Sequence, residues 1–211
     1  ERLIEEILDY ARYMKPKFSM ELVNDIVTSC LHFIAVKAST LNVTIDKQLA
    51  DPLNPILLDR QQMKQVLMNL ILNAMDAMRG SGGRLTVVTR HLTRLDGTQW
   101  VQIEVSDTGC GIAPEDLPHI FDPFFTTKHE STEHAGTGLG LSIVHQIIQE
   151  HGGTVEARST IGQGTTFTLT IPAREKLDQD TSTPSAPKPG KLVLFPGIPP
   201  HLKGQTGTYG P

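Results

Sequence analysis

Two asparagines one helical turn apart are the first residues of this chain whose type and spacing could do chemistry. Asn69 and Asn73 lie in an otherwise apolar run, Asn-Leu-Ile-Leu-Asn-Ala, so on a helix both amides share one face. Two amides on an apolar helix suggest a site. Asparagine is also common on helix surfaces, so the pair alone indicates an exposed face at least as well as a site.

The second candidate is a carboxylate at the end of a predicted strand. Asp107 begins the run Asp-Thr-Gly-Cys-Gly-Ile, in which Gly109 and Gly111 alternate with other residues. Alternate glycines let the backbone approach a ligand closely, and a carboxylate can accept a hydrogen bond from an exocyclic amine such as adenine N6. Because Asp-Gly pairs often follow strands, this motif is weak on its own.

The third candidate is a glycine loop that opens a helix. Gly136, Gly138 and Gly140 recur at every second residue, directly before a helix expected over residues 139–151. Backbone N–H groups at a helix start, helped by the macrodipole, bind phosphate oxygens. The spacing and context fit neither a P-loop nor a Rossmann motif.

Together these motifs resemble the ATP-binding domain of the GHKL superfamily, and specifically that of sensor histidine kinases. The N box, G1 box, F box and G2 box of that family occur here in the family order, at residues 69–74, 107–111, 121–125 and 136–141, and a last glycine motif matches at residues 162–167. The resemblance implies an α/β (α+β) two-layer sandwich, the Bergerat ATP-binding fold, with a mixed sheet of about five strands packed on three helices.

The resemblance also implies that the domain binds ATP with Mg²⁺. It implies that Asn73 gives its amide oxygen to the metal with Asn69 beside it, because Mg²⁺ prefers oxygen ligands. Asp107 would read adenine N6, and Thr165 would support the adenine end. The residues expected around the nucleotide are Asn69, Asn73, Asp107, Gly109, Gly111, Ile112, Lys128, Gly136, Thr137, Gly138, Leu139, Gly140, Leu141 and Thr165.

A long segment over residues 107–137 separates the second and third motifs. It is rich in Gly, Pro, Thr and His, and its length favours a lid or binding loop over a passive connector. By the resemblance, Phe124 and Phe125 would anchor this lid, although an ordinary core role explains them nearly as well.

Lys128 lies where a lid cation could reach the γ-phosphate, and a solvated lysine is the equal alternative. Many histidine kinases carry Lys or Arg three residues after the second N-box asparagine, whereas this chain has Asp76. In this respect the chain resembles the nitrogen-regulation type of kinase. By this resemblance, Lys128 would supply the missing positive charge and act as a catalytic residue with Asn69 and Asn73.

Hydrophobic periodicity predicts the elements that position these residues. Three helices are expected. The first covers residues 19–38 with Ser19 as its cap, the second runs from Asp59 to the glycines at 80–83, and the third covers residues 139–151. Strands are expected over residues 43–46, 56–58, 84–90, 99–106, 154–159 and 165–171.

Three regions follow from these patterns. Residues 1–14 match the end of a dimerisation helix, 15–174 form the catalytic ATP-binding domain, and 175–211 form a flexible tail rich in Pro, Gly, Ser and Thr. The acceptor motif H-E-x-x-x-P-L is absent, so the phosphorylated histidine is expected upstream. The resemblance implies a homodimer of the full protein and a response-regulator receiver domain as partners.

Composition excludes several other classes of protein. The 19 Lys and Arg face 23 Asp and Glu without a basic run, which argues against nucleic-acid binding. No apolar stretch approaches the roughly 20 residues that span a bilayer, so no membrane contact is expected within the chain. Two cysteines, Cys30 and Cys110, lie in unrelated contexts and indicate neither a disulfide nor a zinc site. A cytoplasmic location is expected.

Two rival functions use the same motifs. In a GHL-type ATPase, ATP drives dimerisation and a Glu activates water where this chain has Asn69, and an amide cannot take that proton. A pseudokinase would bind nucleotide without catalysis, but none of the motifs is broken. The interpretation as a histidine kinase is therefore preferred.

Overall fold

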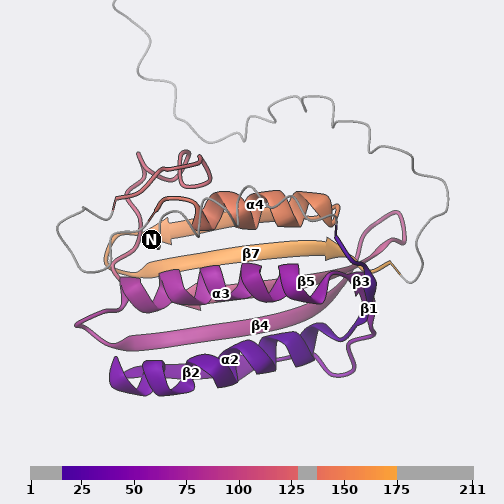
Figure 1. Ribbon diagram of the computed structural model, residues 1–211, viewed down its shortest axis with the longest axis horizontal. Helices are drawn as coiled ribbons and strands as arrows, with labels where there is room; N and C mark the ends of the chain where they lie inside the picture. The colour runs from indigo at the N-terminus through magenta and orange to yellow at the C-terminus, as the bar shows by residue number, and fades with distance from the viewer. Residues whose placement is uncertain (1–15, 128–136, 175–211) are drawn as a thin grey trace, which may run out of the picture. The chain divides into compact units, whose positions relative to one another are not determined.

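A five-stranded mixed sheet and three helices make up most of the part of the chain that the structure describes (Figure 1). The structure is a computed structural model, and it describes residues 16–127 and 137–174. The expected helix at residues 1–13, Lys128, Gly136 and the tail over residues 175–211 lie outside the described residues.

The helices are α2 (Val23–Thr40), α3 (Arg60–Ala77) and α4 (Gly140–Glu150). The strands are β1 (Ser19–Glu21), β2 (Val43–Gln48), β3 (Ile56–Leu58), β4 (Gly83–Thr93), β5 (Gln99–Asp107), β6 (Thr154–Thr160) and β7 (Gly164–Pro172). Each element predicted within the described residues is present, and β4 extends three residues beyond its predicted end at residue 90.

The main sheet has the strand order β2-β4-β5-β7-β6, in which β2 and β4 are parallel and the other pairs are antiparallel. This arrangement confirms the predicted two-layer sandwich. The register pairs Ser106 with Thr166 and Ser159 with Thr165. The end of β5, the start of β7 and the end of β6 therefore meet at one edge of the sheet, where Asp107 lies.

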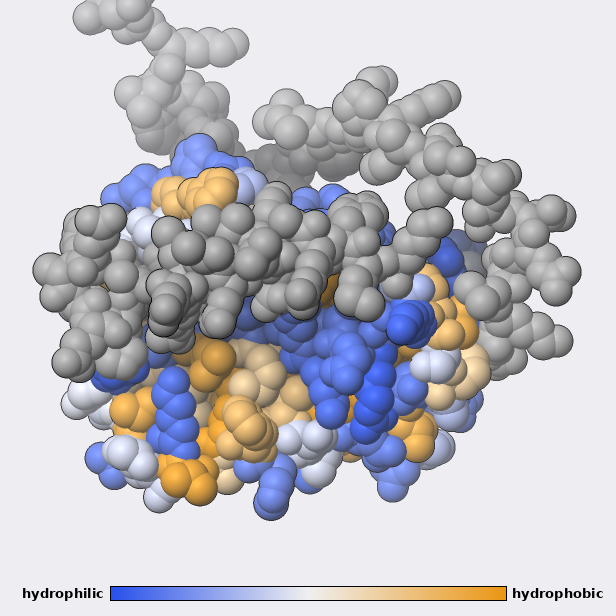
Figure 2. Space-filling model, in the orientation of Figure 1, coloured by the Kyte–Doolittle hydropathy of each residue, from blue (hydrophilic) through white to orange (hydrophobic). Residues whose placement is uncertain are grey.

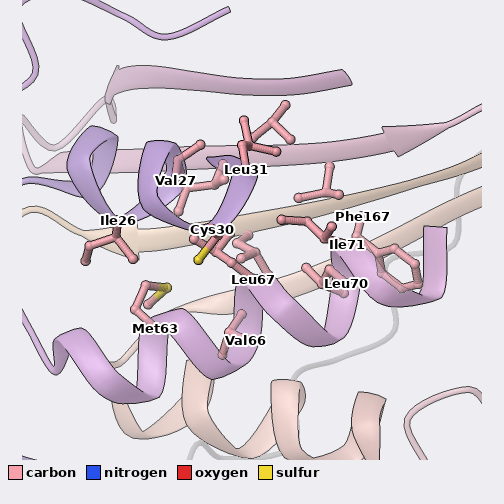
Figure 3. Packing of buried hydrophobic residues seen from close by; sticks show 14 of the residues in the cluster. Ile26, Val27, Cys30, Leu31, Met63, Val66, Leu67, Leu70, Ile71 and Phe167 are labelled. Atoms are coloured by element: carbon pink, nitrogen blue, oxygen red, sulfur yellow. The ribbon is translucent and has the colours of Figure 1, made fainter. Parts of the chain in front are cut away.

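The core lies between the sheet and the helices, all three of which cover the same face in Figure 1. Strand β5 shows the alternation of such a half-covered sheet, since Val101, Ile103 and Val105 are buried and the residues between them are not. Figure 3 shows how α2 and α3 pack against each other and toward β7; the labelled side chains are Ile26, Val27, Cys30, Leu31, Met63, Val66, Leu67, Leu70, Ile71 and Phe167. This packing fixes the position of α3, which carries both asparagines.

The first helix begins later than predicted, and Ser19 does not cap it. Ser19 belongs to β1, which pairs with β3 so that Ser19 lies opposite Leu58. The helix cap is Leu22, which makes no side-chain capping bond. Pairing with a strand about 40 residues away thus overrides the local capping preference of serine.

Asp59 caps α3 as predicted, and it also binds Lys17 near the start of the described chain and His151 at the end of α4. One carboxylate oxygen accepts the N–H groups of Gln61 and Gln62, and the other accepts the N–H of Lys17 at 2.6 Å. The Asp59 N–H donates to Nε2 of the buried His151 at 3.0 Å, and Nδ1 of this ring donates to the Ile147 carbonyl. These bonds need a neutral imidazole, and burial lowers the pKa of His151.

Helix α2 leaves hydrophobic side chains on the surface. Phe33 and Val36 are 77% and 80% exposed, and Figure 2 shows hydrophobic side chains gathered on the surface over this side of the molecule. None of the described helices is long and apolar enough to cross a bilayer.

Candidate nucleotide-binding site

Helix α3 brings two predicted site residues to a half-buried position. Asn69 Nδ2 donates a hydrogen bond to the Gly140 carbonyl at 3.1 Å, which ties α3 to the first residue of α4. Asn73 lies one turn further along, and no described residue hydrogen-bonds its side chain. The structure therefore brings the N box beside the G2 box and leaves the Asn73 amide available for a ligand.

The glycine loop after β5 rests on the last turn of the same helix. The Cys110 N–H donates to the Ala77 carbonyl at 3.1 Å, and a Cβ on Gly109 would lie 2.6 Å from that same oxygen. Only glycine fits at this close approach. Because Ala77 lies one turn after Asn73, the loop from Asp107 to Gly111 is adjacent to the asparagine face of α3.

Asp107 closes the adenine end of the predicted site. The residue is 8% exposed, and its carboxylate accepts the Gly109 N–H at 2.8 Å. Burial raises the pKa of Asp107, while hydrogen bonds from the backbone of Gly109 and Thr165 act in the opposite direction. A buried carboxylate held by the Gly109 N–H is a fixed acceptor, suited to an exocyclic amine.

Thr165 is brought to Asp107 by the sheet register, and a residue that sequence reasoning missed holds it there. Ser159 Oγ lies 3.0 Å from Thr165 Oγ1, donates to the Gly164 carbonyl at 2.9 Å and accepts the Ile112 N–H at 2.8 Å. All three partners of this hydroxyl thus belong to predicted binding segments. A serine in a polar alternating strand carries no local signal of such a role.

The described part of the G2 box lies beside the F box. Gly138 has a φ of +71°, and a Cβ there would lie 2.4 Å from the Phe124 carbonyl carbon. The Phe124 N–H donates to the Gly138 carbonyl at 3.0 Å. Thr137 precedes Gly138 in this segment, and Leu139 and Leu141 follow it. The backbone contact with Phe124 therefore helps to position the N–H groups at the start of α4.

Phe124 does not anchor the lid as predicted. Its side chain is 64% exposed and its φ is +67°, because the backbone turns to make the contact with Gly138. The anchors are Ile120, which is 5% exposed, and Phe121, whose ring lies 6.4 Å from Phe167 and 5.5 Å from His145. Phe125 is half-buried against the core, as expected.

These contacts assemble the described predicted residues into one site along α3. At one end of α3 lie the residues predicted to read adenine, which are Asp107, Gly109, Gly111, Ile112 and Thr165. At the other end lie Asn69, Asn73 and the start of α4. Such an arrangement offers a fixed acceptor for a base at one end and amides with helix N–H groups for phosphates at the other.

The fold and the site together define an ATP-binding α/β domain with the nucleotide motifs around one helix. Residues 58–175 match the model of the family described as histidine kinase-, DNA gyrase B- and HSP90-like ATPase. The chain belongs to this family.

Within the family, the named relatives are histidine kinases. Sensor histidine kinase ZraS of Salmonella typhi is 36% identical over 171 residues, which cover 81% of this chain and 35% of ZraS. Signal transduction histidine-protein kinase AtoS of Escherichia coli (strain K12) is 34% identical over 178 residues, which cover 84% of this chain and 28% of AtoS. The chain thus spans about a third of the length of these relatives.

Solved histidine kinases share the fold. Full-length ShkA in complex with AMPPNP has a TM-score of 0.69 at 26% identity, covering 82% of this chain and 36% of ShkA. Histidine kinase ThkA in complex with response regulator protein TrrA has a TM-score of 0.65 at 27% identity, covering 82% of this chain and 46% of ThkA. The chain is therefore the ATP-binding domain of a homologue of sensor histidine kinases.

Proposed function

We propose that this chain transfers the γ-phosphoryl group of Mg-ATP to a histidine on an upstream dimerisation domain, as the catalytic part of a two-component sensor kinase. The observation that carries the proposal is that α3 joins both ends of the site. Its last turn holds the Asp107 loop through Ala77, and Asn69 holds the start of α4. A nucleotide bound along this helix would have its base and its phosphates fixed by one rigid element.

The residues fit both the nucleotide and its metal ion. Asp107 would accept from adenine N6, with Gly109, Gly111 and Ile112 along the base and Thr165 beside it. Asn73 would give Mg²⁺ its amide oxygen, since this amide has no partner among the described residues. When bound, Mg²⁺ would neutralise phosphate charge.

The phosphoryl step needs mainly positioning and charge stabilisation. In this step the bond from the γ-phosphorus to the ADP oxygen breaks while a bond to an imidazole nitrogen forms, and the imidazole loses its proton. The N–H groups at the start of α4 would hold the phosphates, with Gly136, Gly138, Gly140, Thr137, Leu139 and Leu141 around them. Lys128 would add a cation from the lid.

The partners belong to the same proposal. Residues 1–14 would end the dimerisation helix, the full protein would be a homodimer, and the phosphohistidine would pass its phosphoryl group to a response regulator. The ThkA complex with TrrA supports the last point by homology. This role places the domain in the cytoplasm, where ATP is available.

The test uses γ-labelled ATP. The chain alone is expected to bind ATP without stable labelling, and addition of a histidine-kinase dimerisation domain in trans should produce a label that is acid-labile and alkali-stable. Labelling is expected to be weak, because the covalent link normally raises the effective concentration of the acceptor.

Two results would contradict the proposal. Rapid phosphate release without label would instead support the GHL-type ATPase, although Asn69 offers an amide where that reaction needs a base. Strong acid-labile label on the isolated chain would identify one of its own histidines as acceptor, with the exposed His32 of α2 as the first candidate.

A further inference from the structure

We infer that Ser159 is a positioning residue that sets the base selectivity of this site, an inference that rests on the proposed function. Ser159 lies next to the last residue of β6, opposite Thr165 of β7, and its side chain is half-buried. It touches three segments that surround Asp107. These segments are the Asp107 loop through Ile112, the β6–β7 turn through Gly164, and the start of β7 through Thr165.

The three bonds use the whole capacity of the serine hydroxyl. A hydroxyl has one proton to donate and two lone pairs. The proton goes to the Gly164 carbonyl at 2.9 Å, and one lone pair accepts the Ile112 N–H at 2.8 Å. Only one lone pair remains for the Thr165 hydroxyl at 3.0 Å. Thr165 must therefore donate its proton to Ser159.

This donor count decides what Thr165 can offer a ligand. Because its proton is engaged, the Thr165 hydroxyl is left with lone pairs only. Asp107, whose carboxylate accepts the Gly109 N–H at 2.8 Å, is also an acceptor. Two acceptors at one end of the site favour a 6-amino purine, because its amino group donates hydrogen bonds there. The oxygen of a 6-oxo purine would be a third acceptor facing these two.

Without the Ser159 hydroxyl, the Thr165 proton is free to turn toward the ligand and donate to a 6-oxo group. The Ile112 N–H and the Gly164 carbonyl also lose a partner, so the loop is held less firmly. Ser159 thus acts on selectivity through Thr165 and without touching the nucleotide.

The experiment compares the dissociation constants of ATP and inosine triphosphate by calorimetric titration of the 211-residue chain. We expect Ser159→Ala to lower the preference for ATP by about tenfold, the change that corresponds to roughly one hydrogen bond. Ser159→Thr keeps the hydroxyl and should restore the preference. The control is Ser106→Ala, which removes another hydroxyl pair, Ser106 with Thr166 at 2.9 Å, beside Asp107, and should leave the preference unchanged.

A second variant covers the case in which Ser159→Ala does not fold, as judged by thermal unfolding without nucleotide. Thr165→Val keeps the two other Ser159 bonds and removes only the hydroxyl in question, and it should lower the preference by a similar factor. An unchanged ATP preference in a folded Ser159→Ala or in Thr165→Val overturns the inference while the proposed function stands. A wild-type chain that binds neither nucleotide overturns both.

Discussion

The contact between the Asp107 loop and the β6–β7 turn can be tested with two glycines that have nearly the same positive φ. Gly111 has a φ of +74° and Gly162 a φ of +75°. A Cβ on Gly111 would lie 2.2 Å from the Thr160 carbonyl oxygen, whereas a Cβ on Gly162 would meet nothing within 4 Å. Alanine at either position must therefore adopt a positive φ, and only Gly111→Ala adds a steric clash.

The loop cannot easily relieve this clash. Residues on both sides of Gly111 are bonded to the end of β6 or to the turn after it, because the Ile112 N–H donates to Ser159 and the Cys110 carbonyl accepts the Gly162 N–H at 2.8 Å. A left-handed backbone conformation costs a non-glycine residue about 1–2 kcal/mol, so this cost lowers the stability of both variants. Overpacking adds about 1–3 kcal/mol for Gly111→Ala alone. For a domain of this size that addition corresponds to a further drop in Tm of roughly 2–12 °C.

The assay is thermal unfolding of the wild type and both variants without nucleotide, followed by titration with ATP. Gly162→Ala should lower Tm modestly and keep its ATP affinity. Gly111→Ala should lower Tm further and weaken ATP binding, since the loop must move away from the turn that positions Thr165. Equal Tm values for the two variants would refute the close approach between Gly111 and the Thr160 carbonyl.

Three more predictions concern single side chains. Asn73→Ala should weaken the magnesium-dependent part of ATP binding by roughly tenfold or more, measured by calorimetry with and without Mg²⁺. The control is Gln65→Ala, at an exposed position on the same helix. An unchanged magnesium dependence in Asn73→Ala would exclude Asn73 as a metal ligand. Asp107→Asn should weaken ATP binding roughly 10- to 100-fold and reduce the ratio of ATP affinity to GTP affinity. Competition binding that shows equal affinities for ATP and GTP in the wild type would mean that other residues read the base. Burial lowers the pKa of His151 below its unfolded value of about 6.5, so the stability that the neutral ring contributes is complete above that pH and is lost as the pH falls toward the folded pKa. In urea unfolding between about pH 5 and 7, His151→Gln should lose less unfolding free energy on acidification than the wild type. Identical slopes of unfolding free energy against pH for the two proteins would contradict the neutral buried ring.

Local sequence was sufficient for the elements that carry the site. The apolar spacing on α3 and the capping carboxylate of Asp59 predicted that helix, since period and cap are set by residues within a few positions of each other. The ordered motifs predicted that Asn69, Asp107 and Gly138 serve one ligand. The structure brings the segments that carry Asp107 and Gly138 against α3, the helix that carries Asn69.

The sequence did not reveal which residues anchor and orient these elements, because that depends on partners far away in the chain. Ser19 has the chemistry of a cap, but pairing with Leu58 places it in a strand. Phe124 has the chemistry of an anchor, but its backbone contact with Gly138 turns the side chain outward, and Ile120 and Phe121 bury instead. Ser159 acquires its role only where three strand ends meet.

The physical reason is the range of the interactions involved. Periodicity, caps and glycine spacing act between residues a few positions apart, and they determined the helices, the strands and the candidate ligands of this protein. Hydroxyl orientation and close backbone approach depend on sheet register, which joins Ser159, Thr165 and the end of β5 across more than 50 residues of chain. Only the tertiary structure decides which polar groups become partners, because each donor has one proton to place and several neighbours that could take it.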